Sequence, residues 1–130
     1  SSNENTMKIL KKTQIEFVSD DIDRKSKKPK KENGLTYVPI NTIVDHDSLL
    51  HADIKERKGP VLTQNNPGGL TGKEWLKIIK DQIKEKEKQN DLSVLLVHPL
   101  CMYTLDKFET FEKLCKFLKQ YDSSNMCDLE

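Results

Sequence analysis

The stretch Leu92-Ser93-Val94-Leu95-Leu96-Val97, followed by His98-Pro99, decides our prediction of the fold. It is a nearly continuous apolar run, which is typical of a strand that is covered on both faces, as in a parallel sheet. His98-Pro99 ends the run, because proline has no N–H to donate to a strand ladder. We therefore predict a buried parallel strand over 92–97.

Amphipathic helices are predicted on both sides of this strand. Thr71-Gly72-Lys73-Glu74 has the pattern of a capping box, and the helix that it opens is predicted to run to Gln89, where Asn90-Asp91 stops it. A second helix is predicted from Asp106 to Tyr121, again with capping residues at its start. The apolar faces of the two helices comprise Trp75, Leu76, Ile78, Ile79, Ile83 and Phe108, Phe111, Leu114, Cys115, Phe117, Leu118.

The first part of the chain adds a helix and two extended segments. A short helix capped by Asn5 or Thr6 is predicted to lead into a strand over 15–19. Residues 35–44 are apolar and β-branched but contain Pro39, which predicts an edge strand or a bulged extended segment. Helix and strand thus alternate, which indicates the α/β class. Three candidate strands are too few for a barrel or a doubly wound sheet, so we expect the C-terminal part of a larger α/β fold.

Composition excludes several classes of protein. Of the 130 residues, 33% are charged and the formal net charge is only +1, which argues against a strongly basic nucleic-acid binder or an acidic tail. No apolar run approaches the roughly 20 residues of a membrane-spanning helix. The cysteines, Cys101, Cys115 and Cys127, match no zinc or redox spacing and are predicted to be packed or surface thiols.

A basic segment suggests one alternative function. Residues 24–31 include six basic residues in eight, Pro29 prevents a regular helix, and Asn33-Gly34 marks a turn. We predict an exposed basic loop over 22–34 and a flexible tail over 122–130. In this alternative, the chain is a small non-catalytic α/β interaction module whose loop binds an anionic partner. Nucleic acid is disfavoured as that partner, because no aromatic residues are interleaved.

His98 is the most informative candidate for chemistry. It stands where the predicted strand ends, and ligands of α/β folds bind at the C-terminal ends of strands. A histidine there can act as a general acid or base near neutral pH. The alternative is a strand-end histidine that only hydrogen-bonds a loop.

Two carboxylate-rich segments are further candidates. Asp45, His46, Asp47, His51 and Asp53 are good zinc ligands and suggest a self-contained metalloenzyme, although His46 and His51 do not share one helical face. The alternative is a polar loop. Asp20-Asp21 can bind a metal, act as a base or simply form a turn at a strand end.

Four segments, in this order and spacing, resemble a known family. They are Asn3–Lys12 leading into Ile15–Asp20, Gly34–Ile40, Leu95-Leu96-Val97-His98-Pro99, and the helix 106–121. Together they resemble the C-terminal half of polysaccharide deacetylases of carbohydrate esterase family four. The resemblance implies that residues 1–130 form part of a distorted (β/α) barrel with parallel strands alternating with helices. The missing N-terminal half of the barrel is then the chain's structural partner.

The resemblance also implies an activity and roles for residues. These enzymes hydrolyse N-acetyl groups, and occasionally O-acetyl groups, on sugars. A divalent metal, usually zinc, is bound by an aspartate and two histidines, and a second aspartate acts as base. By the resemblance, His98 is the general acid, Leu95 lines the pocket for the acetyl methyl, and Asp20 or Asp21 is the carboxylate that orients the catalytic groups.

The sequence departs from the family in one respect. The Thr-Phe-Asp-Asp, His-x-x-x-His and Arg-x-Pro-Tyr motifs, which hold the metal and the base, do not occur in it. We therefore expect zinc in the full-length enzyme but no metal and no catalysis in this chain alone. His46 and His51 remain the alternative metal ligands within the chain.

Overall fold

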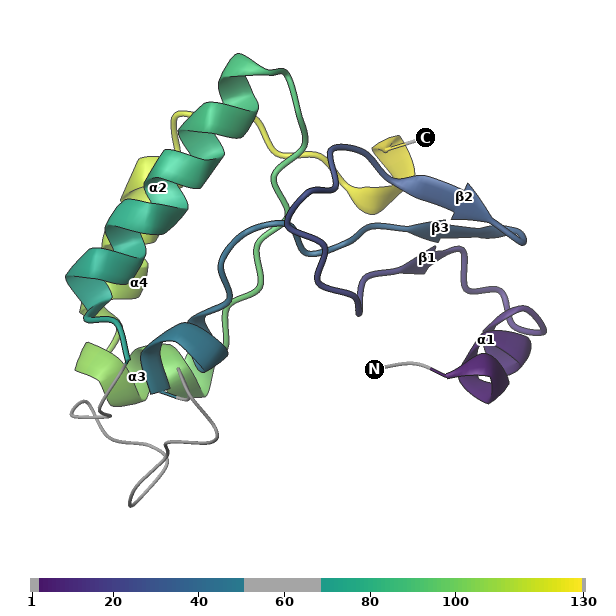
Figure 1. Cartoon of the computed structure of the whole chain (residues 1–130), viewed down its shortest axis with the longest axis horizontal. Coiled ribbons are helices and arrows are strands. Elements are labelled where there is room, and N and C mark those ends of the chain that lie inside the picture. Colours follow the sequence, from purple (N-terminus) through teal and green to yellow (C-terminus); the bar gives the residue numbers. More distant parts are fainter. Residues whose placement is uncertain (1–2, 51–68, 130) are drawn as a thin grey trace.

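The computed structural model describes residues 3–50 and 69–129 (Figure 1). The chain begins with helix α1 (Glu4–Leu10) and continues into a small mixed sheet of β1 (Phe17–Val18), β2 (Lys30–Glu32) and β3 (Leu35–Tyr37). The predicted first helix exists, but its cap is Asn3, whose Oδ1 accepts a hydrogen bond from the Thr6 N–H. The prediction of Asn5 or Thr6 as the cap was therefore wrong.

The sheet has the order β1-β3-β2, with β1 parallel and β2 antiparallel to β3. Asn33 and Gly34 join β2 to β3 with φ values of 55° and 81°, the left-handed geometry of a tight two-residue hairpin. The predicted turn is thus confirmed. The exposed loop predicted over 22–34 was wrong at Lys30–Glu32, which form an edge strand with exposed side chains. The prediction of an edge strand was wrong, because β3 pairs with β1 on one side and β2 on the other. Pro39 does not interrupt it, since β3 ends at Tyr37.

The segment 92–97 is not a buried strand, and this prediction was wrong. It is extended but half-buried along its whole length, and it forms no regular ladder. Its neighbour is the segment that follows β3, where Asn41 and Thr42 hydrogen-bond to it and Asp45 hydrogen-bonds to the residue directly after it. The Asn41 N–H donates to the Val94 carbonyl (3.2 Å), and its side-chain oxygen accepts from the Val94 N–H (2.8 Å). A side chain thus replaces the main-chain partner that a strand requires.

The second half of the chain is a helical layer of α2 (Gly72–Lys88), α3 (Pro99–Asp106) and α4 (Glu109–Leu118), with α2 and α4 side by side (Figure 1). The predicted capping box is confirmed: Glu74 Oε2 accepts from the Thr71 N–H (2.8 Å), and Thr71 Oγ1 accepts from the Glu74 N–H (3.3 Å). The helix core is formed by the buried side chains Ile43, Leu49, Trp75, Leu76, Ile79, Ile83, Cys101, Met102, Leu105 and Leu114.

The predicted helix over 106–121 is shorter than expected and is preceded by a helix that we did not predict. Lys107 and Phe108, with φ values of 51° and 73°, separate α3 from α4. The Asp106 carboxylate accepts hydrogen bonds from the Thr110 N–H (3.1 Å) and hydroxyl (2.6 Å), which fixes this corner. Pro99 at the first position of α3 was the available signal, because proline is favoured there.

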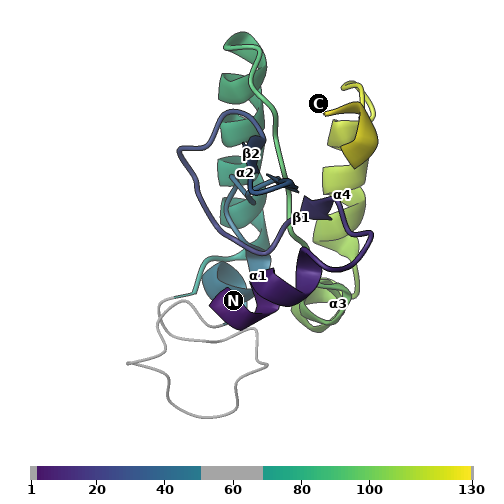
Figure 2. The same cartoon turned by 90° about the vertical axis from the view of Figure 1, so that its right-hand side faces the viewer.

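The sheet and α1 lie at one end of the molecule, and α2 and α4 lie at the other (Figure 1). Seen from the sheet end, α1 and the strands stand in front of the helical layer (Figure 2). Two short turns complete the fold, the π-helical η1 (His46–Leu50) and the 3-10 helix η2 (Met126–Asp128), which occupies the predicted tail. The described residues form this sheet and helical layer and no barrel, so the barrel remains a prediction. None of the helices described is both long and apolar enough to cross a membrane.

Candidate active site

The candidate site lies where two extended segments end side by side. Residues 41–45 and 94–98 run in the same direction, since Asn41 bonds Val94 at one end and Asp45 bonds His98 at the other. Asp45 precedes η1, and His98 is the N-cap residue of α3. The carboxyl ends of two parallel segments thus bring a carboxylate and an imidazole together, as in α/β active sites.

Asp45 and His98 form a hydrogen-bonded dyad. Asp45 is completely buried; its Oδ2 accepts from the His98 backbone N–H (2.7 Å), and its Oδ1 lies 2.7 Å from His98 Nδ1. An ionised carboxylate only accepts hydrogen bonds, so we assign the proton to Nδ1. Nε2 is then the ring nitrogen left for substrate, on a side chain that is 42% exposed.

Cys101 and His46 lie beside this dyad. His46 Nδ1 is 3.3 Å from Cys101 Sγ, and the centroids of the His46 and His98 rings are 5.3 Å apart. Burial, and then the nearby Asp45 and Asp47 carboxylates, raise the pKa of the Cys101 thiol. A thiol that is held protonated is a poor nucleophile, so we do not assign Cys101 a nucleophilic role.

The structure places the other predicted site residues elsewhere. Asp20 and Asp21 are exposed after β1 and line a hollow with Lys30 and Tyr37. The carboxylate that hydrogen-bonds the His98 side chain and its backbone N–H is that of Asp45. Leu95 packs against the helical core and lines a hollow near the far end of α2. Of the proposed histidine pair, His46 is in the site, and His51 lies outside the described residues, as does Asp53.

Sequence reasoning missed the pairing of Asp45 with His98, and it missed Cys101. The signal was present for the first: Asp45 follows the apolar run Thr42-Ile43-Val44 as His98 follows the run 92–97. Polar residues after two parallel segments are expected to meet at one edge. Cys101 lies three residues after His98, a spacing that places both on one side of a helix start.

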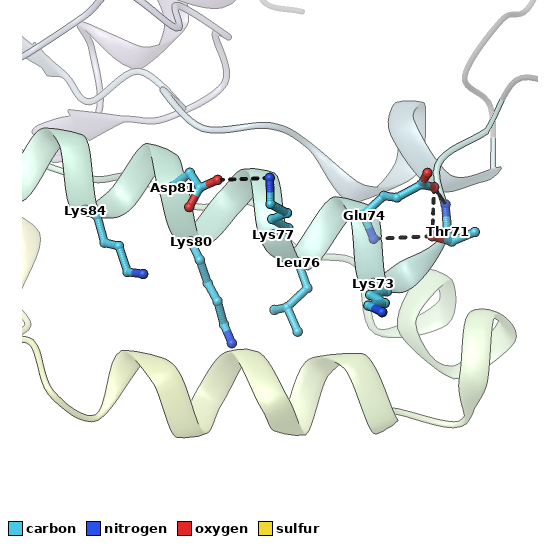
Figure 3. Close-up of a pocket in the computed structure, with 8 residues that line it drawn as sticks. All are labelled: Thr71, Lys73, Glu74, Leu76, Lys77, Lys80, Asp81 and Lys84. Carbon is cyan, nitrogen blue, oxygen red and sulfur yellow. Dashed lines mark hydrogen bonds and ion pairs between the residues drawn. The ribbon is translucent and has the colours of Figure 1, made fainter.

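Another hollow, along α2, carries no comparable chemistry. It is lined chiefly by lysines of α2, together with Thr71, Glu74, Leu76 and Asp81 (Figure 3). Lys80 and Lys84 lie 5.2 and 5.9 Å from the centre of the Phe117 ring, and Lys77 pairs with Asp81 at 3.8 Å. These lysines cover apolar surface with their stems while their charges stay solvated.

The basic segment 24–31 is partly neutralised by its neighbours. Lys27 lies 3.7 Å from an Asp91 carboxylate oxygen, and Lys30 lies 3.7 Å from one of Asp23. Both lysine side chains are exposed, at 64% and 68%, so these pairs contribute little to stability, but they lower the local positive charge. The segment is therefore a weaker anion-binding surface than its sequence suggests.

No family model, curated protein or solved structure matches this chain. The function must therefore be argued from the site, and the deacetylase family remains a resemblance.

The described residues do not reproduce the metal site that the resemblance implies, in which an aspartate and two histidines bind the metal and the acid histidine stays free. Asp45, His98 and Cys101 offer ligand atoms within 4.8 Å of one another. However, the distance of 2.7 Å between Asp45 Oδ1 and His98 Nδ1 is that of a hydrogen bond. Two nitrogen or oxygen ligands of one tetrahedral zinc are roughly 3.3 Å apart. A metal here would also occupy the imidazole that the family uses as its acid, so this is not the catalytic metal site of such an enzyme.

Proposed function

We propose that this chain carries the acid–base residues of a hydrolase that removes acetyl groups from N-acetylated sugars, with His98 as general acid. The observation that carries the proposal is the dyad, in which a fully buried Asp45 bonds both His98 Nδ1 and its backbone N–H at 2.7 Å. The resemblance to polysaccharide deacetylases supplies the substrate class.

The dyad suits the protonation of a leaving amine. When the C–N bond of an acetamide breaks, the amine nitrogen must receive a proton, and a histidine can deliver one near neutral pH. Asp45 holds the Nδ1–H tautomer, so that the proton to be delivered resides on Nε2 of the imidazolium. Because its second oxygen is bonded to the His98 N–H, the carboxylate is fixed in orientation.

Activation of the attacking water belongs to other residues. In the family that the chain resembles, a divalent metal lowers the pKa of water and polarises the acetyl carbonyl. The described residues do not provide that site, and the ligand motifs do not occur in this sequence. We therefore expect that residues 1–130 alone do not hydrolyse the substrate and that they act together with a metal-binding half-barrel.

The test is acetate release from N-acetylglucosamine oligomers by the protein as it is encoded, including whatever sequence flanks these residues. His98→Asn is expected to lower kcat by about 10²–10⁴-fold with little change in KM, the usual effect of removing a general acid. Asp45→Asn is expected to lower kcat as well, whereas Asp122→Asn, a matched change at an exposed carboxylate after α4, is expected to leave it unchanged. No acetate release, or an unchanged kcat in His98→Asn, would overturn the proposal.

A further inference from the structure

We propose that Cys101, His46, His98 and Asp45 form a binding site for a thiophilic divalent cation of the Zn²⁺ class, and that the cation competes with the Asp45–His98 hydrogen bond. This site differs from the metal site of the resemblance in its ligands, since it includes a cysteine. It also differs in its effect, because a cation bound here breaks the hydrogen bond between Asp45 and His98.

The donors converge from two segments that are far apart in the sequence. His98 and Cys101 stand three residues apart at the start of α3, and Asp45 and His46 are adjacent at the start of η1. Asp45, His98 and Cys101 offer ligand atoms within 4.8 Å of one another. His46 lies at the edge of this group as an additional donor, since its Nδ1 is hydrogen-bonded to Cys101 Sγ at 3.3 Å.

The distances show which part of the site is already spaced for a metal. Cys101 Sγ and His46 Nδ1 are hydrogen-bonded at 3.3 Å. Sulfur and nitrogen ligands of one tetrahedral zinc are roughly 3.5 Å apart, so this pair needs little movement to bind the same cation. Asp45 and His98 are closer than two zinc ligands, and they must separate by about half an ångström as the Nδ1 proton leaves. Metal binding and the proton-bearing dyad are therefore alternative states of the same residues.

The donor set and its surroundings select the class of cation. Thiolate and imidazole ligands favour zinc and similar ions over Mg²⁺ and Ca²⁺, which prefer oxygen. Asp45 and Cys101 are 0% and 2% exposed. A cation that binds here displaces the proton of the Cys101 thiol. The resulting thiolate and the Asp45 carboxylate then offset its two positive charges, which are costly to bury uncompensated.

Binding of the cation would block the proposed acid, because it occupies the imidazole that must hold and deliver the proton. This consequence rests on the proposed function. The binding itself does not, since it depends only on the four donors.

The experiment is a titration of the chain with Co²⁺, a spectroscopic substitute for Zn²⁺, followed by displacement with Zn²⁺. We expect one equivalent to bind, with a thiolate-to-cobalt charge-transfer band in the near ultraviolet and tetrahedral bands in the visible. Cys101→Ser is expected to abolish the charge-transfer band and to weaken zinc binding by about 10–100-fold or more, the loss typical of damaged metal sites. Cys127→Ser, at an exposed cysteine, is the matched control and is expected to bind as the parent does.

Because Cys101 lies in the core, Cys101→Ser could disturb the fold, so a second variant is needed to separate loss of metal binding from misfolding. His46→Asn changes a half-buried donor and is expected to weaken zinc binding while the far-ultraviolet circular dichroism stays unchanged. Absence of a one-to-one complex, or a charge-transfer band that survives Cys101→Ser, would overturn the site. Either result leaves the acetate-release test untouched, and a failed acetate-release test leaves the cobalt spectrum untouched.

Discussion

Asp45 is the residue on which the candidate site depends, because it positions both the imidazole and the backbone of His98. In Asp45→Asn, one amide oxygen still accepts a hydrogen bond, but the amide NH₂ now faces the other donor. A buried donor without an acceptor costs about 1–3 kcal/mol. We expect the free energy of unfolding to fall by that amount and the Nδ1–H tautomer of His98 to lose its preference.

Urea denaturation measures the first effect, and the ¹⁵N chemical shifts of the His98 ring measure the second. Asp47→Asn is the matched control, since this neighbouring carboxylate is exposed and is expected to change the free energy of unfolding by less than about 0.5 kcal/mol. If Asp45→Asn kept the parent tautomer and stability, the dyad would have no positioning role.

At the scale of the element, the start of α2 is confined by the corner between α3 and α4. A Cβ built on Gly72 lies 2.5 Å from Thr110 Oγ1 and 3.0 Å from Leu105 Cδ2. Alanine is normally about 1 kcal/mol better than glycine within a helix. Here the overlap dominates, because Thr110 is itself fixed by Asp106. We expect Gly72→Ala to destabilise the protein by about 1–3 kcal/mol, the usual cost of overpacking.

Thermal and urea unfolding test this prediction. Lys73→Ala, at the exposed neighbouring position of the same helical turn, is the control and is expected to be nearly neutral. A stabilised Gly72→Ala variant would show that Thr110 and Leu105 move aside at little cost and that the gain in helix propensity exceeds the cost of the overlap.

The capping box of α2 gives a pH dependence. The hydrogen bond from the Thr71 backbone, and then that from its hydroxyl, lower the pKa of Glu74. A carboxyl group whose pKa is lower in the folded state stabilises that state above its unfolded pKa, and the effect is lost as the pH falls through the folded pKa. We therefore expect Glu74→Gln to be less stable than the parent at neutral pH and to approach it in acid.

Urea denaturation at neutral and acidic pH measures this convergence. Glu87→Gln, an exposed glutamate near the other end of α2, serves as the comparison because it takes no part in the cap. A difference between Glu74→Gln and the parent that is the same at both pH values would contradict the assigned role of the carboxylate.

The elements that could be predicted from sequence are those held by local contacts. The capping box joins residues three apart, so Thr71 and Glu74 sufficed to locate the start of α2. The segment 92–97 was mispredicted because its partner is the Asn41 side chain, which no local pattern reveals. The same reason applies to the site: His98 could be singled out from its position, but its pairing with Asp45 depends on the register of two remote segments.

At the scale of the whole molecule, Asn41 connects the sheet side of the chain to the segment that enters the site. Its side-chain NH₂ donates to the carbonyls of Ser26 (2.9 Å) and Leu92 (2.8 Å), and its side-chain oxygen accepts from the Val94 N–H (2.8 Å). Asn41 is 3% exposed, so water cannot readily replace these bonds. We expect Asn41→Ala to lower the free energy of unfolding by about 3 kcal/mol, since three hydrogen bonds of a buried side chain, of about 1 kcal/mol each, are lost.

Thr42→Val provides a graded comparison, because the fully buried Thr42 donates a single hydrogen bond to Val94 (3.0 Å) and valine has nearly the same shape. We expect it to cost about 1 kcal/mol in urea denaturation. The connection also reaches the site: Asn41 and Val94 each stand four residues before the members of the dyad. Asn41→Ala should therefore also weaken the tautomer preference of His98 seen by ¹⁵N NMR, which Thr42→Val should leave intact. If the dyad stayed unchanged in Asn41→Ala, the two ends of the paired segments would be independent, and Asp45 alone would position His98.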